Sequence, residues 1–328
     1  MNGSPEIIAS EQVGITSLSD DILYIIMCMV FNFSDFIECY KIGKINKQLN
    51  RIVLNIIPTL TQINFYNTTF HTWARTDGLE KILKETKNIT TLELKKVTCN
   101  YHKLLSFLLF LKDNTPLTTC RFNNVYKYEV NKRIKNVSVI TYDCLESFLT
   151  TTTYTELDFS NMGIDSNNAV TALAKYLKHN DIKLTTLDLS SNDLSIRYLT
   201  SLTKVLEINK TLTKLNLSNN SVYACDITRV LKYNSTLTTL ILSNTGIGFL
   251  DEVIPLPFAE ALKRNTTLTT LDLSCNKIRS RMIIAIVEAV KKKTLTLLDL
   301  RGCNIGADGA KAIAEALETN TTIQIITT

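Results

Sequence analysis

The chain has little of what catalysis usually requires. It holds 3 histidines, His71, His102 and His179, in 328 residues. None lies at a spacing from a cysteine or a carboxylate that would form a nucleophile–base pair. The glycines of segment 246–248 (GIG) lack the third glycine and the helix start of a dinucleotide-binding fingerprint, and no phosphate-binding loop or metal-ligand spacing occurs. We therefore expect a protein that is not an enzyme and that uses no cofactor and no metal.

Paired cysteines and membrane-spanning runs are also missing from the sequence. The 8 cysteines are scattered without a C-x-x-C pair, which is typical of reduced thiols in an intracellular protein. The apolar run 22–31 (ILYIIMCMVF) is too short to span a membrane, and it follows Asp20 and Asp21 instead of the basic residues of a secretory signal. We expect a cytoplasmic protein. The frequent Asn, Lys, Ile and Thr suggest an AT-rich genome, and for a parasite or a virus the expected compartment is the host cytoplasm.

The excess of positive charge is modest, with a formal net charge of +5. The lysines at 291–293 follow a predicted helix, where cations complement the helix dipole. Segment 126–135, in which four Lys and Arg residues are interleaved with Tyr126 and Tyr128, is a better candidate for nucleic-acid binding. Because it is a short patch and not a basic stripe, we expect neither nucleic acid nor a membrane as the partner.

What the sequence does contain is a repeat. The frame L-x-x-L-x-L-x-x-N-x-I runs from Leu268 to Ile278, and it recurs at 184–194 and 212–222. Perfect and degenerate copies together start at Leu60, Ile89, Leu117, Ile134, Tyr154, Leu184, Leu212, Leu237, Leu268, Leu295 and Ile323. Most of these starts are separated by about 20–30 residues, a period typical of leucine-rich repeats.

Each frame predicts a short strand followed by a helix. The last two leucines lie two residues apart, so a strand turns both into the core. The asparagine after the strand (Asn192, Asn220, Asn276) can satisfy backbone groups of turns in neighbouring repeats, and Thr245 and Cys303 can make weaker versions of that contact. Helical stripes follow at 169–177, 199–206, 258–262, 283–290 and 307–318.

The repeats predict an α/β fold over residues 59–328, a leucine-rich-repeat solenoid. Strands stack about 4.8 Å apart whereas helices need roughly 10 Å, so parallel strands should line the concave face and helices the convex face. We expect irregularity at 117–154, because the starts at Leu117, Ile134 and Tyr154 lie 17 and 20 residues apart. This spacing leaves no room for full helices and predicts loops there, through either decay of the repeat or a notch that admits a partner.

The last complete repeat, 295–322, contains the run CNIGADGA at 303–310, then AEAL at 314–317 and Asn320. This unit resembles the ribonuclease-inhibitor type of leucine-rich repeat. The units from about residue 154 onward share its frame, and the last one carries the Gly-x-x-Gly-Ala signature intact. The resemblance implies a protein-binding module, but not ribonuclease binding, because partner choice depends on variable concave residues.

The first 58 residues do not carry the repeat. Residues 1–15 are polar and aperiodic, and we expect a disordered lead. Residues 16–58 predict short helices that begin at a capping box formed by Ser17 and Asp20. This block resembles an F-box, although Ser19 replaces the usual proline and Gln48-Leu49 stands where tryptophan is common. The resemblance implies a small all-α domain that binds the Skp-type adaptor of a cullin–RING ubiquitin ligase. The matching positions are Leu18, Ile22, Leu23, Ile26, Asp35, Phe36, Ile42, Lys44 and Leu49.

The same helices can instead cap the exposed apolar end of the repeat stack. The run 22–31 is apolar around most of a helix, which fits burial on two sides, such as a cap face plus a partner groove. Two functions therefore stay open: a ligase substrate receptor, or a stand-alone repeat scaffold, host-directed if the source is a parasite or a virus. A third, a fragment of a nucleotide-sensor-like repeat protein, is disfavoured because no NTPase domain is present.

The residue between the last two strand leucines should face the concave side. This column is predicted as Asn64, Glu93, Arg121, Ser138, Asp158, Asp188, Asn216, Ile241, Asp272 and Asp299. Its polar members from Asp158 onward, together with Arg301, are the candidate partner-binding residues. Threonines and serines flank them and are ordinary exposed strand residues; alternatively, the face is a shallow acidic groove for a basic protein substrate. Aromatic and arginine anchors typical of tight interfaces are missing there.

Overall fold

The computed structural model describes residues 62–66, 69–70, 88–96, 98–99, 101–127, 142–150, 153–164, 167–179, 181–248, 255–291 and 294–327. The chain divides into two compact units, 1–56 and 57–328. All described residues belong to the second unit. The predicted disordered lead and the F-box-like block at 16–58 lie outside the described residues, and they stay predictions.

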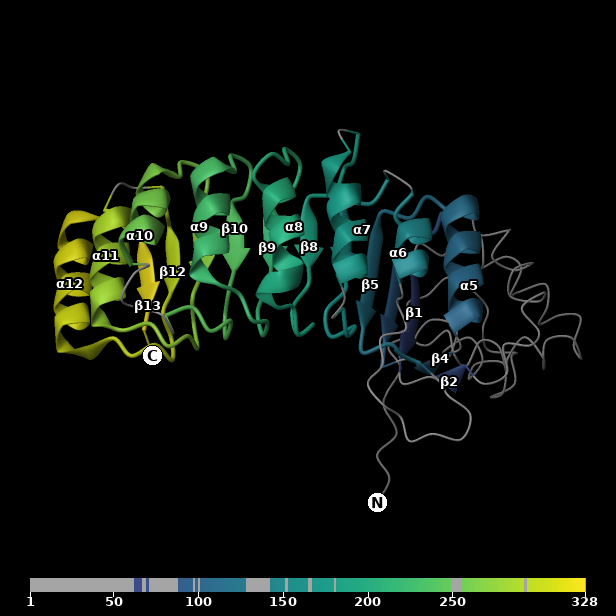
Figure 1. Cartoon of the computed structure of the whole chain (residues 1–328), viewed down its shortest axis with the longest axis horizontal. Coiled ribbons are helices and arrows are strands. Elements are labelled where there is room, and N and C mark those ends of the chain that lie inside the picture. Colours follow the sequence, from purple (N-terminus) through teal and green to yellow (C-terminus); the bar gives the residue numbers. More distant parts are fainter. Residues whose placement is uncertain are drawn as a thin grey trace, which may run out of the picture. The chain divides into compact units, whose positions relative to one another are not determined.

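The second unit is built on one parallel sheet of ten strands (Figure 1). In sheet order the strands are β1 (Gln62–Tyr66), β3 (Thr91–Lys95), β5 (Thr119–Asn123), β7 (Glu156–Asp158), β8 (Thr186–Asp188), β9 (Lys214–Asn216), β10 (Thr239–Ile241), β11 (Thr270–Asp272), β12 (Leu297–Asp299) and β13 (Gln324–Ile326). A second parallel sheet joins β2 (Thr69–Phe70), β4 (Thr98–Cys99) and β6 (Tyr126–Lys127).

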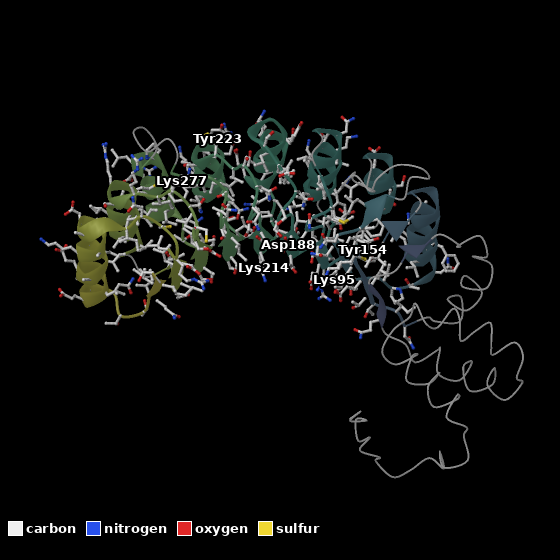
Figure 2. The ribbon with its side chains drawn as sticks, turned by 90° about the horizontal axis from the view of Figure 1, so that it is seen from below. Lys95, Tyr154, Asp188, Lys214, Tyr223 and Lys277 are labelled. Atoms are coloured by element: carbon white, nitrogen blue, oxygen red, sulfur yellow. The ribbon has the colours of Figure 1, made fainter. Side chains whose placement is uncertain are left out.

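A row of helices covers one face of the ten-stranded sheet (Figure 1). They are α5 (Tyr101–Asn114), α6 (Tyr142–Phe148), α7 (Asn167–Lys178), α8 (Ile196–Leu206), α9 (Ala224–Tyr233), α10 (Pro255–Arg264), α11 (Ser280–Val290) and α12 (Gly306–Thr319). Within this unit the strands follow the inner side of a curve and the helices its outer side (Figure 2). The predicted alternation of parallel strands and helices is confirmed.

The core lies between the strands and the helices and is mostly leucine. The two inward leucines of a strand, such as Leu187 with Leu189 and Leu215 with Leu217, are completely buried. Helix residues spaced three and four apart, such as Ile283 and Val287, close the core from the other side. Each fully buried side chain of this size contributes about 1.5–3 kcal/mol.

The coil predicted at Ile134 is wrong. Strand β5 pairs directly with β7, so that Arg121 lies beside Asp158 and the row has no place for Ser138 between them. Residues 117–154 therefore belong to one long repeat instead of two short ones. The two valines at 137 and 139 have the spacing of inward strand residues, and this pattern suggested a strand between β5 and β7, which the direct pairing of those two strands excludes.

The loop predicted for the helical side of this repeat is also wrong in part, because α6 packs between α5 and α7. Leu145 and Phe148 of α6 are buried, three residues apart. The Phe148 ring lies 4.9 Å from the ring of Tyr154 and 5.6 Å from that of Phe122. These large side chains fill the core of the long repeat, which retains a helix.

Candidate protein-binding surface

The predicted column lies on the open face of the sheet, which the helices do not cover. Parallel register aligns it in a single row, called here the open-face row: Asn64, Glu93, Arg121, Asp158, Asp188, Asn216, Ile241, Asp272, Asp299 and Ile326. Every predicted candidate from Asp158 to Asp299 is in the row, and Ser138 is not. Side chains of neighbouring strands stand about 4.8 Å apart along it.

The acidic members of the open-face row have a structural task at the end of each strand. An oxygen of Asp188 accepts a hydrogen bond from the backbone N–H of Ser190 at 2.8 Å, and Asp158 and Asp272 do the same with Ser160 and Ser274. Asn216 makes the equivalent contact to Ser218 at 3.0 Å. Such turns suit Asp and Asn alike. This contact explains why one short polar side chain recurs in the row without any partner being involved.

The two ends of the acidic stretch differ in electrostatics. Burial raises the pKa of Asp158, the hydrogen bonds from Ser160 oppose the rise, and the carboxylate of Asp188 adds to it. Burial also acts to raise the pKa of Asp299, but hydrogen bonds from Arg301 outweigh it, and the net pKa is lowered. Nη2 of Arg301 lies 2.6 Å from Oδ2 of Asp299. The candidate Arg301 therefore neutralises its neighbour.

Basic groups break up the acidity of the open face. Arg121 binds Glu156 on the next strand through two contacts, Nε to Oε1 at 2.9 Å and Nη2 to Oε2 at 3.1 Å. Lys95 and Lys214 are exposed, and Figure 2 shows both on the strand side of the unit with Asp188. The open face is polar and mixed in charge, and less acidic than the row alone predicts.

The predicted asparagine ladder is confirmed. Oδ1 of Asn192 accepts hydrogen bonds from the N–H groups of Met162 and Ile164 in the preceding repeat, at 2.9 and 3.1 Å. Its Nδ2 donates to the carbonyls of Phe159 and Leu189. Asn220 and Asn276 repeat this pattern.

Of the two substitutes in the ladder, Cys303 makes the expected weaker contact to the preceding repeat, whereas the Thr245 hydroxyl bonds a carbonyl within its own repeat. Oγ1 of Thr245 donates to the carbonyl of Leu242 at 2.8 Å, and Sγ of Cys303 to that of Leu273 at 3.3 Å. At Thr245 the link to the preceding repeat is instead a backbone bond, in which the N–H of Val222 donates to the carbonyl of Thr245 at 3.0 Å.

Sequence reasoning missed a second asparagine ladder, at the turns between helices and strands. Nδ2 of Asn209 donates to the carbonyl of Leu177, and its Oδ1 accepts from the N–H of Leu212 at 2.8 Å. Asn234, Asn265 and Asn320 make corresponding contacts. The signal was available, because an asparagine lies three residues before the first apolar residue of each of these frames.

The threonines that flank the open face form a further ladder that was not predicted. Each hydroxyl donates to the backbone carbonyl of the corresponding threonine one repeat earlier. The donors are Thr118, Thr155, Thr185, Thr213, Thr238, Thr269 and Thr296. The frequent threonine therefore has a structural explanation in these hydrogen bonds between repeats.

The F-box-like candidates from Leu18 to Leu49 lie outside the described residues. Within the part that the structure describes, no group of three or more His, Cys, Asp or Glu side chains is placed to hold a metal ion. No helix in that same part is both long and apolar enough to cross a membrane.

Comparison with known proteins supports the repeat assignment. The family described as Leucine Rich repeat matches residues 177–195, 264–286 and 291–314. No curated protein matches the chain significantly.

Three solved structures match parts of the chain. The leucine-rich repeat-containing protein LegL7 from Legionella pneumophila is 16% identical, with a TM-score of 0.49 and coverage of 81% of each chain. The tropomodulin C-terminal domain from Caenorhabditis elegans is 15% identical, with a TM-score of 0.39, covering 56% of this chain and 94% of that one. Actin-binding site 2 of leiomodin-1 is 19% identical, with a TM-score of 0.35, covering 55% and 87%. At these scores the likenesses carry no inference about function. The three matched segments and the parallel sheet described above agree that the chain contains leucine-rich repeats.

Proposed function

We propose that the chain is a non-enzymatic adaptor that works in the cytoplasm. The repeats recruit a protein substrate, and the helices predicted at 16–58 dock on the Skp-type adaptor of a cullin–RING ubiquitin ligase. The observation that carries the proposal is the open face of the ten-stranded sheet, which the helix row leaves uncovered. A parallel sheet normally has both faces covered, so a mostly polar face that no described helix covers is a surface available to a partner.

The ligase half of the proposal is supported by sequence. Leu18, Ile22, Leu23 and Ile26 match the first F-box helix, and the segment 22–31 is more apolar than a helix buried on one side requires. A second buried face fits a groove on an adaptor protein.

A stand-alone scaffold, directed at a host if the source is a parasite or a virus, is the second candidate. Strand β1 pairs with β3 on one side and has no other neighbour among the described strands. The end of a solenoid exposes apolar core and needs a cover. In this candidate the helices at 16–58 only cap the stack.

Co-purification with a Skp-type adaptor separates the two candidates. If the chain is a ligase receptor, the wild-type protein binds the adaptor. The double variant Ile22→Asp and Ile26→Asp should lose this binding, while its circular dichroism spectrum stays the same because the repeats remain folded. The matched control, Ile7→Asp and Ile8→Asp in the predicted lead, keeps binding. If wild type recovers no adaptor, the ligase role is lost and the scaffold stands.

The substrate half is tested by filling the open face. Thr186→Trp and Thr270→Trp place bulky side chains on β8 and β11, at positions whose own side chains face the open side. Proximity labelling with the wild-type protein identifies its partners, and the same experiment with this double variant should no longer label them. Lys204→Trp and Arg281→Trp, exposed on the helices α8 and α11 of the same repeats, should leave them in place. Equal loss with both pairs would contradict a partner on the open face.

A further inference from the structure

Two of the large apolar side chains exposed in the described part of the chain occupy equivalent places in consecutive repeats. Ile208 is 60% exposed and Tyr233 is 51% exposed. Each directly precedes a buried asparagine of the second ladder, Asn209 or Asn234. In the flanking repeats, His179 and Arg264 hold the same position and are also exposed. His179, Ile208, Tyr233 and Arg264 are called here the helix-end row.

The turns that carry this row are fixed in place. Asn209 donates to the carbonyl of Leu177 at 2.9 Å, and Asn234 donates to that of Leu206 at 2.7 Å. Asn265 continues the series by donating to Leu231 at 2.9 Å. Each turn is thus bonded to the end of the preceding helix. A partner that docks on the row would lose little entropy in ordering it.

The surroundings of the row are strongly basic. The four turns 178–183, 207–211, 232–236 and 263–267 hold six Lys or Arg residues and two acidic residues, Asp181 and Glu207. Glu207 is already paired with Arg229, with Nε to Oε1 at 2.8 Å. Within the described part of the chain, no ion pair joins Lys178, Lys183 or Arg264 to a carboxylate. The net positive charge of this edge is therefore available to a partner.

A small hollow lies between two of these turns. It has a volume of ≈ 70 Å³, and Lys178, His179, Ile208 and Lys210 are among its lining residues. The two ammonium groups and the imidazole belong to adjacent repeats, and the aliphatic side chain lies with them. The hollow has room for a single carboxylate next to an apolar group.

We propose that the helix-end row is a docking surface for an acidic protein segment. Apolar side chains of the segment cover Ile208 and Tyr233, and its carboxylates meet Lys178, Lys210 and Arg264. The row offers an aromatic side chain, Tyr233, and an arginine, Arg264, residue types that are common anchors at interfaces. The inference rests on the proposed protein-binding function. It adds a second contact surface, which binds an acidic protein segment.

A nucleic acid fits this surface less well. Phosphates repeat at short, even intervals and carry no apolar group that could cover Ile208. Ile208, which is 60% exposed and lies between His179 and Tyr233 in the row, has no ring on which a base could stack.

Fluorescence anisotropy tests the proposal with the full chain and three probes: a peptide of alternating Glu and Leu, its Gln-for-Glu counterpart, and a thymidine oligonucleotide. We expect wild type to prefer the Glu peptide and to bind it more weakly as salt rises. Lys178→Glu with Arg264→Glu should lower this affinity about tenfold or more. Ile208→Ser should lower it about fivefold with an unchanged salt dependence.

The matched control is Arg281→Glu with Lys311→Glu, exposed cations of α11 and α12 outside the row. This pair makes the same change in net charge and should leave affinity within about twofold of wild type. Tighter binding of the oligonucleotide, or equal loss with both charge pairs, would overturn the proposal. So would the absence of any peptide binding.

The open-face variant Thr186→Trp with Thr270→Trp separates this inference from the proposed function. If it abolishes peptide binding and the helix-end variants do not, the helix-end row is refuted and the scaffold function stands. If partners are lost from the open face while the peptide stays bound, the helix-end row stands and the two surfaces are independent.

Discussion

A hydrogen bond joins Asn192 to Asn220 in the next repeat. The side-chain oxygen of Asn220 accepts from the backbone N–H of Asn192 at 3.1 Å and from that of Leu194 at 2.9 Å. Its Nδ2 donates to the carbonyls of Leu189 and Leu217, both at 2.9 Å. One buried amide therefore satisfies backbone groups that water cannot reach, and the loop between repeats depends on it.

Asn220→Ala should lower the free energy of unfolding by about 3 kcal/mol, because two backbone N–H groups and the carbonyls of two repeats lose a buried partner. Urea denaturation followed by circular dichroism measures the effect. Ser221→Ala, at the exposed neighbouring position, should change the stability by less than about 0.5 kcal/mol. Equal effects would show that the amide contacts are dispensable.

Gly246 and Gly248 both have positive φ, +82° and +96°, but their surroundings differ. A Cβ on Gly246 would meet no atom within 4 Å, whereas one on Gly248 would lie 2.6 Å from the backbone oxygen of Lys277. Gly246→Ala should cost about 1 kcal/mol for the backbone conformation alone. Gly248→Ala should cost about 3 kcal/mol, because the next repeat must move. Thermal unfolding of the two variants distinguishes them, and a Gly248→Ala variant as stable as Gly246→Ala would refute the close approach.

Asp158→Asn should stabilise the protein near neutral pH and have little effect in acid. Burial raises the pKa of Asp158 in the folded state. The contribution of Asp158 to the free energy of unfolding is therefore fully present below its unfolded pKa of about 3.9. It is lost as pH rises through the folded pKa. Asparagine removes this loss and keeps the turn contact, as Asn216 shows. Urea midpoints at about pH 3 and pH 7 measure the difference.

Asp299→Asn should act in the opposite direction. Burial favours a higher pKa for Asp299, but the contacts from Arg301 outweigh it and the pKa is lowered. Its stabilisation is present above the unfolded pKa and disappears as pH falls through the folded pKa. The variant should therefore be less stable than wild type at neutral pH and similar to it in strong acid. The same pair of urea midpoints tests this, and a variant equally destabilised at both pH values would point to packing instead of charge.

Thiol labelling should follow burial. Cys225 and Cys275 are exposed, whereas Cys120 is buried and burial raises its thiol pKa well above the usual range. Burial also raises the pKa of Cys303, to about 11. Brief iodoacetamide treatment at neutral pH followed by mass spectrometry should find label on Cys225 and Cys275, little on Cys303 and none on Cys120. Early label on Cys120 would mean that the core at β5 opens readily.

The fold could be predicted because the leucine frame is a local pattern that specifies both strand and core. The register that aligns Asp188 with Asn216 follows from the frame alone, once repeats are parallel. The long repeat could not be predicted in the same way. Val137 and Val139 fit the two inward leucine positions as well as Cys120 and Phe122 do. Only the pairing of β5 with β7, which aligns Arg121 with Asp158, shows which pattern lies in the sheet.

The candidate surface was harder to predict, because the same side chains serve the fold. The sequence shows Asp188 as an acidic group on an exposed strand, but not that Ser190 and Asn216 occupy its oxygens. The repeat pattern indicated binding candidates on the strands only. It did not indicate Ile208 and Tyr233, because their exposure depends on how the helix ends are stacked. Exposure of single apolar residues is a property of packing, which a periodic pattern does not contain.

The asparagine ladder makes one whole repeat exchangeable with the next. Asn220 lies 28 residues after Asn192 and contacts the turn before it just as Asn192 contacts its own predecessor. Excision of residues 184–211 would bring Asn220 to Met162 and Ile164, with Leu215 and Leu217 in place of Leu187 and Leu189. An in-frame loss or duplication of one repeat in the gene would therefore keep the contacts between the repeats on either side. The length of the binding surface can change by whole repeats while the residue types that line it stay the same.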